Sequence, residues 1–318
     1  MKIILQILII LTLFATCSDP KIDMIYRTQM REFVQSLSKW SKSQKPDFII
    51  IPQNGHDLFS TTEEPDAAIA IDYLSAVNGA GQEDLFYGYE DDNIATPTED
   101  NSWIRGFLDI GKKNGVTILV TDYCNDSVKM ADSYKKNSEK GYISFAANHR
   151  GLDNVPNFPI NNSNPDTIKS LADVKNFLYL IDPEQFASKS AFIETIDTTN
   201  YDLFIIDLFV GENISLSKED LAKLKTKPNG APRLVVSYMS IGEAEDYRYY
   251  WQSDWKLGYP LWLREKNPDW EGNFKVEYWQ KDWQDIIFGN STSYLQKIIN
   301  AGFDGAYLDI IEAFEYFE

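Results

Sequence analysis

The sequence has few of the side chains that most often bind transition metals, with two histidines and two cysteines in 318 residues. His56 and His149 belong to no HxH or HExxH pattern, which argues against a histidine-based metal centre. Cys17 lies in the N-terminal segment, so Cys124 is left alone in the rest of the chain and an intramolecular disulfide is excluded. We expect no metal and no cofactor, although a calcium site made only of carboxylates stays open.

Several motifs of common enzyme classes are also missing. No GxGxxG or GxxxxGK[ST] follows a hydrophobic run, so no phosphate-binding loop is indicated, and no GxSxG suggests a serine nucleophile. Positively charged residues are also few: the chain has 30 Lys and Arg but 48 Asp and Glu, which gives a net charge of −18. A polyanion would be repelled, which excludes nucleic acid and an anionic membrane surface as expected partners and favours a neutral or cationic ligand.

The first residues have the pattern of an export signal. Met1 and Lys2 precede an apolar run over residues 3–14 that is too short to span a membrane, and small residues then precede Cys17. Residues 13–17 resemble a lipoprotein signal, which predicts a signal peptide over residues 1–17 and lipidation of Cys17. The alternative is an ordinary secretory signal. We therefore expect an exported protein: an outer-membrane or cell-surface lipoprotein held only by its lipid, or otherwise a periplasmic or secreted protein.

Hydrophobic runs that alternate with helical periodicity dominate residues 21–318. Eight short runs predict strands, at 47–51, 76–83, 116–122, 142–146, 177–181, 201–207, 233–240 and 304–309. Amphipathic segments predict helices at 22–43, 103–113, 128–140, 184–196, 218–225 and 283–300. This alternation predicts an α/β protein with a parallel sheet, folded as a single-domain (β/α)8 TIM barrel; an open doubly wound sheet is the alternative.

The order of the predicted elements is unusual for such a barrel. The pattern begins on a helix and ends on a strand, whereas a (β/α)8 chain ordinarily begins on a strand. A closed ring would bring helix 22–43 next to the strand at 304–309, so we expect a circularly permuted barrel; an incomplete chain is the alternative.

Polar residues gather where the predicted strands end, and most of them are acids. In a barrel these positions share one mouth, and a ring of carboxylates there costs repulsion unless it binds a cation or performs acid–base chemistry. Aromatic residues make up 14% of the chain, which suits sugar faces. Glycoside hydrolysis by two carboxylates is the function that these acidic and aromatic residues support best. We predict substrate contacts from Gln53, Asn54, Asp122, Tyr123, Asp207, Tyr238 and Glu243.

Three segments carry a family resemblance: VSYMSIGEAEDYR (236–248), GFDGAYLD (302–309) and DFIIIPQNG (47–55). Together they resemble the signature segments of glycoside hydrolase family 114, which includes endo-α-1,4-polygalactosaminidases and relatives once described as related to cysteinyl-tRNA synthetase. In that family the DFIIIPQNG-like segment follows the other two, whereas here it precedes them. The resemblance therefore also implies a circular permutation.

The resemblance implies a catalytic pair and a substrate. The family's Asp at the end of the GFDGxxLD strand corresponds to Asp309, and its Glu followed after two residues by Phe corresponds to Glu83. Asp309 would act as the nucleophile or its equivalent and Glu83 as the general acid/base. The implied substrate is an α-linked galactosamine-type polysaccharide, and a carboxylate among the predicted contacts could hold its protonated amine. The alternative function is a non-catalytic saccharide-binding surface lipoprotein.

Overall fold

Parallel strands form the centre of the molecule, in a computed structural model that describes residues 20–211 and 214–318. A five-stranded sheet has the order β1-β11-β7-β6-β5, and a three-stranded sheet has the order β2-β3-β4; every neighbouring pair in both is parallel. The strands are β1 (Ile49–Pro52), β2 (Gly79–Glu83), β3 (Thr117–Tyr123), β4 (Ile143–Ala147), β5 (Phe177–Leu180), β6 (Leu203–Asp207), β7 (Leu234–Ser240) and β11 (Gly305–Asp309). The predicted α/β fold with parallel sheets is confirmed.

The two sheets meet at β1 and β2. A parallel bridge pairs Gln53 with Gly81, the Asn54 N–H donates to the Gly81 carbonyl at 2.8 Å, and the Asn78 N–H donates to the Ile50 carbonyl at 2.8 Å. At the other edges β4 lies beside β5, where the Phe145 and Phe177 rings are 5.7 Å apart, but no ladder joins these two strands in the described part. The carboxyl ends of β1, β2 and β11 are thus neighbours.

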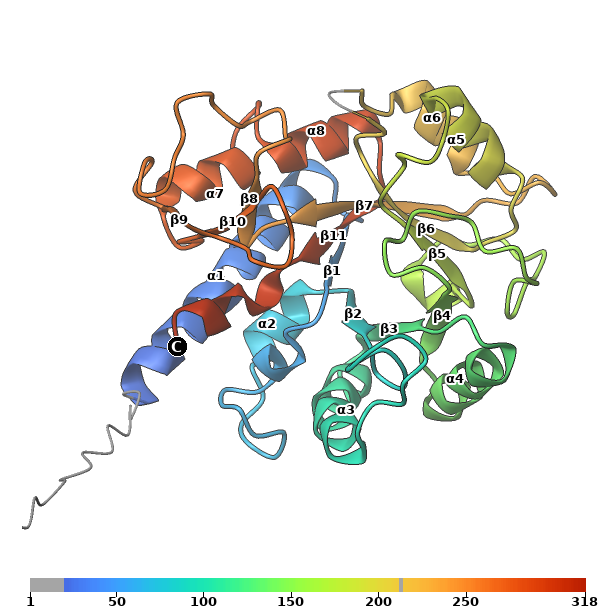
Figure 1. Ribbon diagram of the computed structural model, residues 1–318, viewed down its shortest axis with the longest axis horizontal. Coiled ribbons are helices and arrows are strands. Elements are labelled where there is room, and N and C mark those ends of the chain that lie inside the picture. Colours follow the sequence, from blue (N-terminus) through green and yellow to red (C-terminus); the bar gives the residue numbers. More distant parts are fainter. Residues whose placement is uncertain (1–19, 212–213) are drawn as a thin grey trace, which may run out of the picture.

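Helices cover the outside of the sheets (Figure 1). They are α1 (Pro20–Gln44), α2 (Ile71–Ala76), α3 (Thr98–Lys113), α4 (Ser127–Lys140), α5 (Lys189–Asp197), α6 (Lys218–Leu224), α7 (Lys281–Ile287) and α8 (Tyr294–Ala301), with short 3-10 turns η1 (His56–Phe59), η2 (Leu171–Asp173) and η3 (Ile311–Tyr316). Local sequence sets their ends: Asp126 caps α4 through the N–H groups of Val128 and Lys129, and Gly141 ends it with a positive φ of 66°.

α1 lies between α2 and α8, so the first helix covers the region where β1 meets β11. Phe33 is 1% exposed and its ring is 5.9 Å from Phe288, while the Lys45 Nζ donates to the Phe303 carbonyl at 2.8 Å.

An excursion between β7 and α7 forms a small antiparallel sheet of β8 (Glu243–Glu245), β10 (Asn273–Val276) and β9 (Leu263–Lys266). Tryptophans from this excursion pack on one another and on α7: Trp255 and Trp262 are 4.9 Å apart, and Trp262 and Trp283 are 5.0 Å apart. These rings therefore form the core of the excursion.

The part of the chain described here contains no helix long and apolar enough to cross a membrane. The expected signal peptide over residues 1–17, with its lipidated Cys17, lies outside the described residues.

We expect Phe33→Ala to lower the free energy of unfolding by about 3–4 kcal/mol, because it removes a fully buried ring between α1 and the rest of the core. Glu32→Ala, one residue along on the exposed side of the same helix, should change it by less than about 0.5 kcal/mol. Urea titrations monitored by tryptophan fluorescence measure both. Equal effects from the two variants would show that α1 does not contribute to the core as described.

Candidate active site

Glu83 ends β2 and is held by donors from two other strands. Its Oε2 accepts from the Gln53 Nε2 at 2.6 Å and from the Asn54 Nδ2 at 3.3 Å, and its Oε1 accepts from the Tyr123 hydroxyl. The Glu83 N–H donates to the Asn54 Oδ1 at 3.1 Å. Gln53, Asn54 and Tyr123, which were predicted as substrate contacts, are therefore brought together around this carboxylate. The Arg150 guanidinium lies 4.0 Å over the Tyr123 ring and bridges to Asp92 at 2.8 Å.

Asp309 ends β11. Its Oδ2 accepts from the Tyr238 hydroxyl at 2.7 Å, and its Oδ1 accepts from the N–H of Ile310 at 2.8 Å. Ile310 has a φ of 57°, a left-handed conformation that is unusual for a β-branched residue, and turns the chain sharply into η3. A Cβ on Gly242 would lie 2.2 Å from the Ile310 carbonyl oxygen, so the glycine in SIGEAED leaves room for this turn.

Two tyrosines form the floor between these carboxylates. Tyr179 donates to the Gln53 Oε1 at 2.7 Å, and its ring centroid is 5.1 Å from that of Tyr307. A Cβ on Gly81 would lie 1.9 Å from the Tyr307 hydroxyl, so a glycine on β2 is needed for this hydroxyl to fit. The sequence-based prediction missed both tyrosines, because they lie inside strands rather than after them.

Burial and nearby negative charges raise the pKa values of the two carboxyl groups. Burial and then the charge of Asp309 raise the pKa of Glu83 to about 7, against the Tyr123 and Asn54 donors that favour the ionised form. Burial also raises the pKa of Asp309 to about 6, against the Tyr238 and Ile310 donors that favour the ionised form. Asp309 and Glu83 therefore lie within electrostatic reach of each other, at the ends of the two strands that flank β1.

A third carboxylate, Glu312, belongs to the same group. Burial, and then the charges of Asp309 and Glu83, raise its pKa well above the usual range. Its Oε2 is buried and has no hydrogen-bond partner among the described residues. The sequence marks Glu312 only as one of several acids after the last strand, and nothing in its local pattern singles it out.

Asp207 and Glu243 are bound to other side chains. Asp207 pairs with Arg248 at 2.7 Å, and Arg248 also pairs with Glu245 at 2.7 Å, forming a buried triad of charges. Glu243 is fully buried. Its Oε1 accepts from the Asn267 Nδ2 at 3.0 Å and from the Tyr316 hydroxyl at 3.0 Å, and its Oε2 accepts from the Asn273 Nδ2 at 3.2 Å. Because Asp207 and Glu243 are already bound to other side chains, the substrate contacts predicted for these two residues could only be indirect.

Asp122 lies beneath the loop that follows Glu83. Its Oδ1 accepts from the N–H groups of Phe86 and Tyr87 at 2.8 and 3.2 Å, and its Oδ2 accepts from Ser133 at 2.6 Å and from Asn137 at 3.1 Å. The side chain is completely buried. Its place in the structure is to hold the β2–α3 loop against α4.

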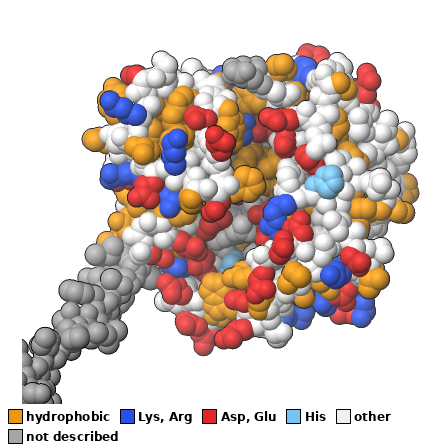
Figure 2. Space-filling view, viewed as in Figure 1, with side chains coloured by type: hydrophobic (Ala, Val, Ile, Leu, Met, Phe, Trp, Pro, Cys, Tyr) orange, Lys and Arg blue, Asp and Glu red, His pale blue; other side chains and the backbone are white. Residues whose placement is uncertain are grey.

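The region where β11, β1 and β2 meet lies under a hollowed face. Figure 2 shows acidic side chains gathered around this hollow. Among the described residues, no group of three or more His, Cys, Asp or Glu side chains is arranged to hold a metal ion.

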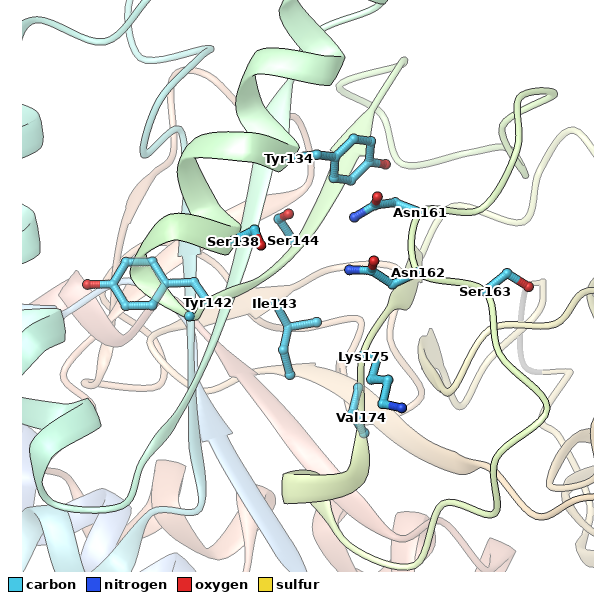
Figure 3. A pocket seen from close by; sticks show the side chains of 11 residues that line it. Tyr134, Ser138, Tyr142, Ile143, Ser144, Asn161, Asn162, Ser163, Val174 and Lys175 are labelled. Carbon is cyan, nitrogen blue, oxygen red and sulfur yellow. The ribbon is translucent and has the colours of Figure 1, made fainter.

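A second hollow, of about 540 Å³, lies elsewhere (Figure 3). Side chains of α4 and β4 line one side of it, and residues 161–163 with Lys175 line the other. The chain between β4 and β5 contains the short η2 in place of a covering helix, which leaves this space open. Its lining includes none of the carboxylates described above and none of the predicted site residues.

Acids at the carboxyl ends of parallel strands are an arrangement in which α/β enzymes place their catalytic groups. Residues 179–317, less than half of the chain, match the model of glycoside hydrolase family GH114, and this match supports membership of that family. The matched residues include Tyr238 and Asp309, whereas Glu83 comes from the preceding part of the chain.

The chain is also similar to three uncharacterized proteins. One, MJ1477 of Methanocaldococcus jannaschii, is 45% identical over 130 residues, which are 40% of this chain and 35% of that protein. A protein of Thermotoga maritima is 49% identical over 81 residues, which are 26% of this chain and 24% of that protein. A protein of Deinococcus radiodurans is 37% identical over 123 residues, which are 39% of this chain and 37% of that protein. The matches thus span only about a quarter to somewhat over a third of these relatives.

We expect Tyr123→Phe to raise the pKa of Glu83 above about 7, because the tyrosine hydroxyl favours the ionised carboxylate. A titration of the Glu83 carboxyl carbon by NMR, with Glu83→Gln to assign the signal, measures this shift. Tyr134→Phe serves as a control, because its hydroxyl accepts from the Ala146 N–H rather than contacting Glu83. An unchanged or lowered value in Tyr123→Phe would contradict the described hydrogen bond.

Proposed function

We propose that this protein is an exported glycoside hydrolase that cleaves an α-linked galactosamine-type polysaccharide with Glu83 and Asp309. The observation that supports the proposal is the position of these two carboxyl groups at the carboxyl ends of β2 and β11, the strands on either side of β1, each with a raised pKa. Membership of a glycoside hydrolase family supports the same reaction class. The galactosamine-type substrate rests on the resemblance of the three sequence segments.

The surroundings of the two groups suggest different roles. Glu83, with a pKa of about 7, retains its proton over part of the neutral range and can donate it to the glycosidic oxygen as the bond to the anomeric carbon breaks. Asp309 is ionised at lower pH and is oriented by Tyr238 and the Ile310 N–H. It can attack the anomeric carbon or orient a water molecule for that attack.

The eight parallel strands would form a closed, circularly permuted barrel in this proposal. The connection of β1 to β2 through Gln53 and Gly81, and the closeness of β4 to β5, support closure. The place of α1 between α2 and α8 supports the permutation, because a helix that precedes β1 then covers the join with the last strand. Closure would direct the carboxyl ends of all eight strands to one mouth.

The location follows from the N-terminal pattern. We propose that the chain is exported and anchored by a lipid on Cys17, which would place the acidic face outside the cytoplasm, where polysaccharides are found.

Glu83→Gln and Asp309→Asn should each lower polysaccharide cleavage by about 10²–10⁴-fold, because each removes a proton donor or the attacking group. The two variants should differ on an aryl glycoside with a good leaving group. Glu83→Gln should recover much of its activity on that substrate, since the departing phenolate needs no proton, whereas Asp309→Asn should not. Reducing-end release and aryl release measure the two reactions.

Glu139→Gln, an exposed acid on α4, is the matched control and should cleave both substrates like the unmodified protein. If the unmodified protein binds a partly deacetylated α-1,4-galactosaminan without cutting it, the proposal fails and a saccharide-binding function replaces it. If Glu83→Gln and Asp309→Asn lose the two reactions to the same extent, the assigned roles are wrong.

The dependence of kcat/KM on pH should be bell-shaped. Activity should fall above about pH 7 as Glu83 loses its proton, and below about pH 6 as Asp309 gains one. Initial rates between pH 4 and pH 9 on a substrate without titratable groups measure both limbs. A rate that rises steadily to pH 9 would exclude Glu83 as the general acid.

A further inference from the structure

Glu312 is an acid of this face that has an unpartnered carboxylate oxygen. Its Oε2 is buried and has no hydrogen-bond partner among the described residues, and the hydrogen bond that favours its ionised form comes from its own backbone N–H. The residue as a whole keeps some exposed surface. A buried polar atom without a partner costs free energy, so a partner from outside the chain would be favourable.

The other acids nearby are already occupied. Asp207 is paired with Arg248, and Glu243 accepts from Asn267, Asn273 and Tyr316. Asp122 accepts from four donors. These three acids are occupied by side-chain or backbone donors, whereas the Glu312 Oε2 has no hydrogen-bond partner among the described residues.

Glu312 also lies within electrostatic reach of Asp309 and Glu83, so three carboxyl groups share one small region. Arg150 pairs with Asp84 and Asp92, and Arg27 pairs with Asp57 and Glu318, while Lys275 lies over the Tyr316 ring. A ligand complementary to this acidic region carries positive charge, and on the proposed polysaccharide the group that does so is a primary ammonium.

We propose that Glu312 binds the protonated amine of the sugar and thereby makes the site selective for an amino sugar over its neutral counterparts. This inference rests on the proposed function and deepens it, by assigning the recognition of the amine to one residue. An ammonium group offers three donors and a full positive charge, which match the unpartnered carboxylate and offset its repulsion with Asp309 and Glu83.

Binding should then release a proton. Burial and the neighbouring carboxylates keep the pKa of Glu312 high in the empty site, and an adjacent ammonium would favour the ionised form. The titratable groups that face Glu312 are Asp309, Glu83, Glu315, Tyr307 and Tyr316. A released proton is assigned to Glu312 only if it disappears when that residue is replaced.

The test is calorimetric titration with three monosaccharides: galactosamine, N-acetylgalactosamine and galactose. The unmodified protein should bind galactosamine at least about tenfold more tightly than the other two, as charge-assisted hydrogen bonds require. Titration in two buffers of different ionisation enthalpy should show proton release with galactosamine alone. Glu312→Gln should abolish both the preference and the proton release.

Two further variants separate charge from structure. Glu312→Asp keeps the charge and should retain part of the preference, and Glu139→Gln makes the same change at an exposed acid on α4 and should retain all of it. Circular dichroism establishes that each variant is folded. A Glu312→Asp variant that binds all three sugars alike, although folded, would contradict the proposal.

The outcomes also distinguish this inference from the hydrolase proposal. A preference for galactosamine that depends on Glu312, without cleavage of any polysaccharide, would support amine recognition and reject hydrolysis. Cleavage with no preference for galactosamine, or a preference that survives in Glu312→Gln, would overturn the role of Glu312 and leave the roles of Glu83 and Asp309 standing.

Discussion

The burial of carboxyl groups at the ends of β2 and β11 is the constraint on which this site depends. Burial favours the neutral forms of Glu83 and Asp309; the charge of Asp309 adds to that effect at Glu83, and the charges of Glu245 and Glu243 add to it at Asp309. The hydrogen-bond donors around the two carboxyl groups determine how far each pKa is shifted. Glu83 receives side-chain donors from Gln53, Asn54 and Tyr123, and Asp309 receives a hydroxyl and a backbone N–H.

The rest of the structure positions those donors. The bridge between Gln53 and Gly81 joins the two sheets and brings Gln53 and Asn54 to Glu83. Tyr179 in turn orients Gln53 from β5 on the far side of the five-stranded sheet. The left-handed turns at Asn54, Asp84 and Ile310 follow directly after the three strand ends, so the chain leaves the site sharply on each strand. Such conformations persist where surrounding contacts hold them, as the close approach of Gly242 to Ile310 shows.

The acids that stabilise the fold differ from Glu312 in having charged or hydrogen-bonding partners. Arg248 lies between Asp207 and Glu245 and neutralises part of an otherwise acidic interior. Asp122 uses its charge on backbone and side-chain donors and holds the loop after Glu83. Glu312 has no such partner, and this difference is the basis for its proposed role in recognising an amine.

The amino-acid sequence by itself determined the elements. The hydrophobic runs predicted all eight parallel strands, because buried strands covered by helices on one side and a core on the other need continuous apolar residues. It also placed Asp309 and Glu83 at strand ends, and the match over residues 179–317 supports the family that the SIGEAED and GFDG segments indicate. The cluster of loop tryptophans could be read from composition, but not whether their rings would be exposed or packed.

Only the tertiary structure decided which of the acids share a space. Asp122, Asp207, Glu243 and Glu312 all follow strands and look equivalent in the sequence, yet three are matched by donors from distant segments and one is not. Those donors, such as Asn137, Arg248 and Asn267, lie in helices and loops whose contacts no local pattern predicts. The charge state of a carboxyl group depends on burial and on neighbours in space, and both are properties of the folded chain.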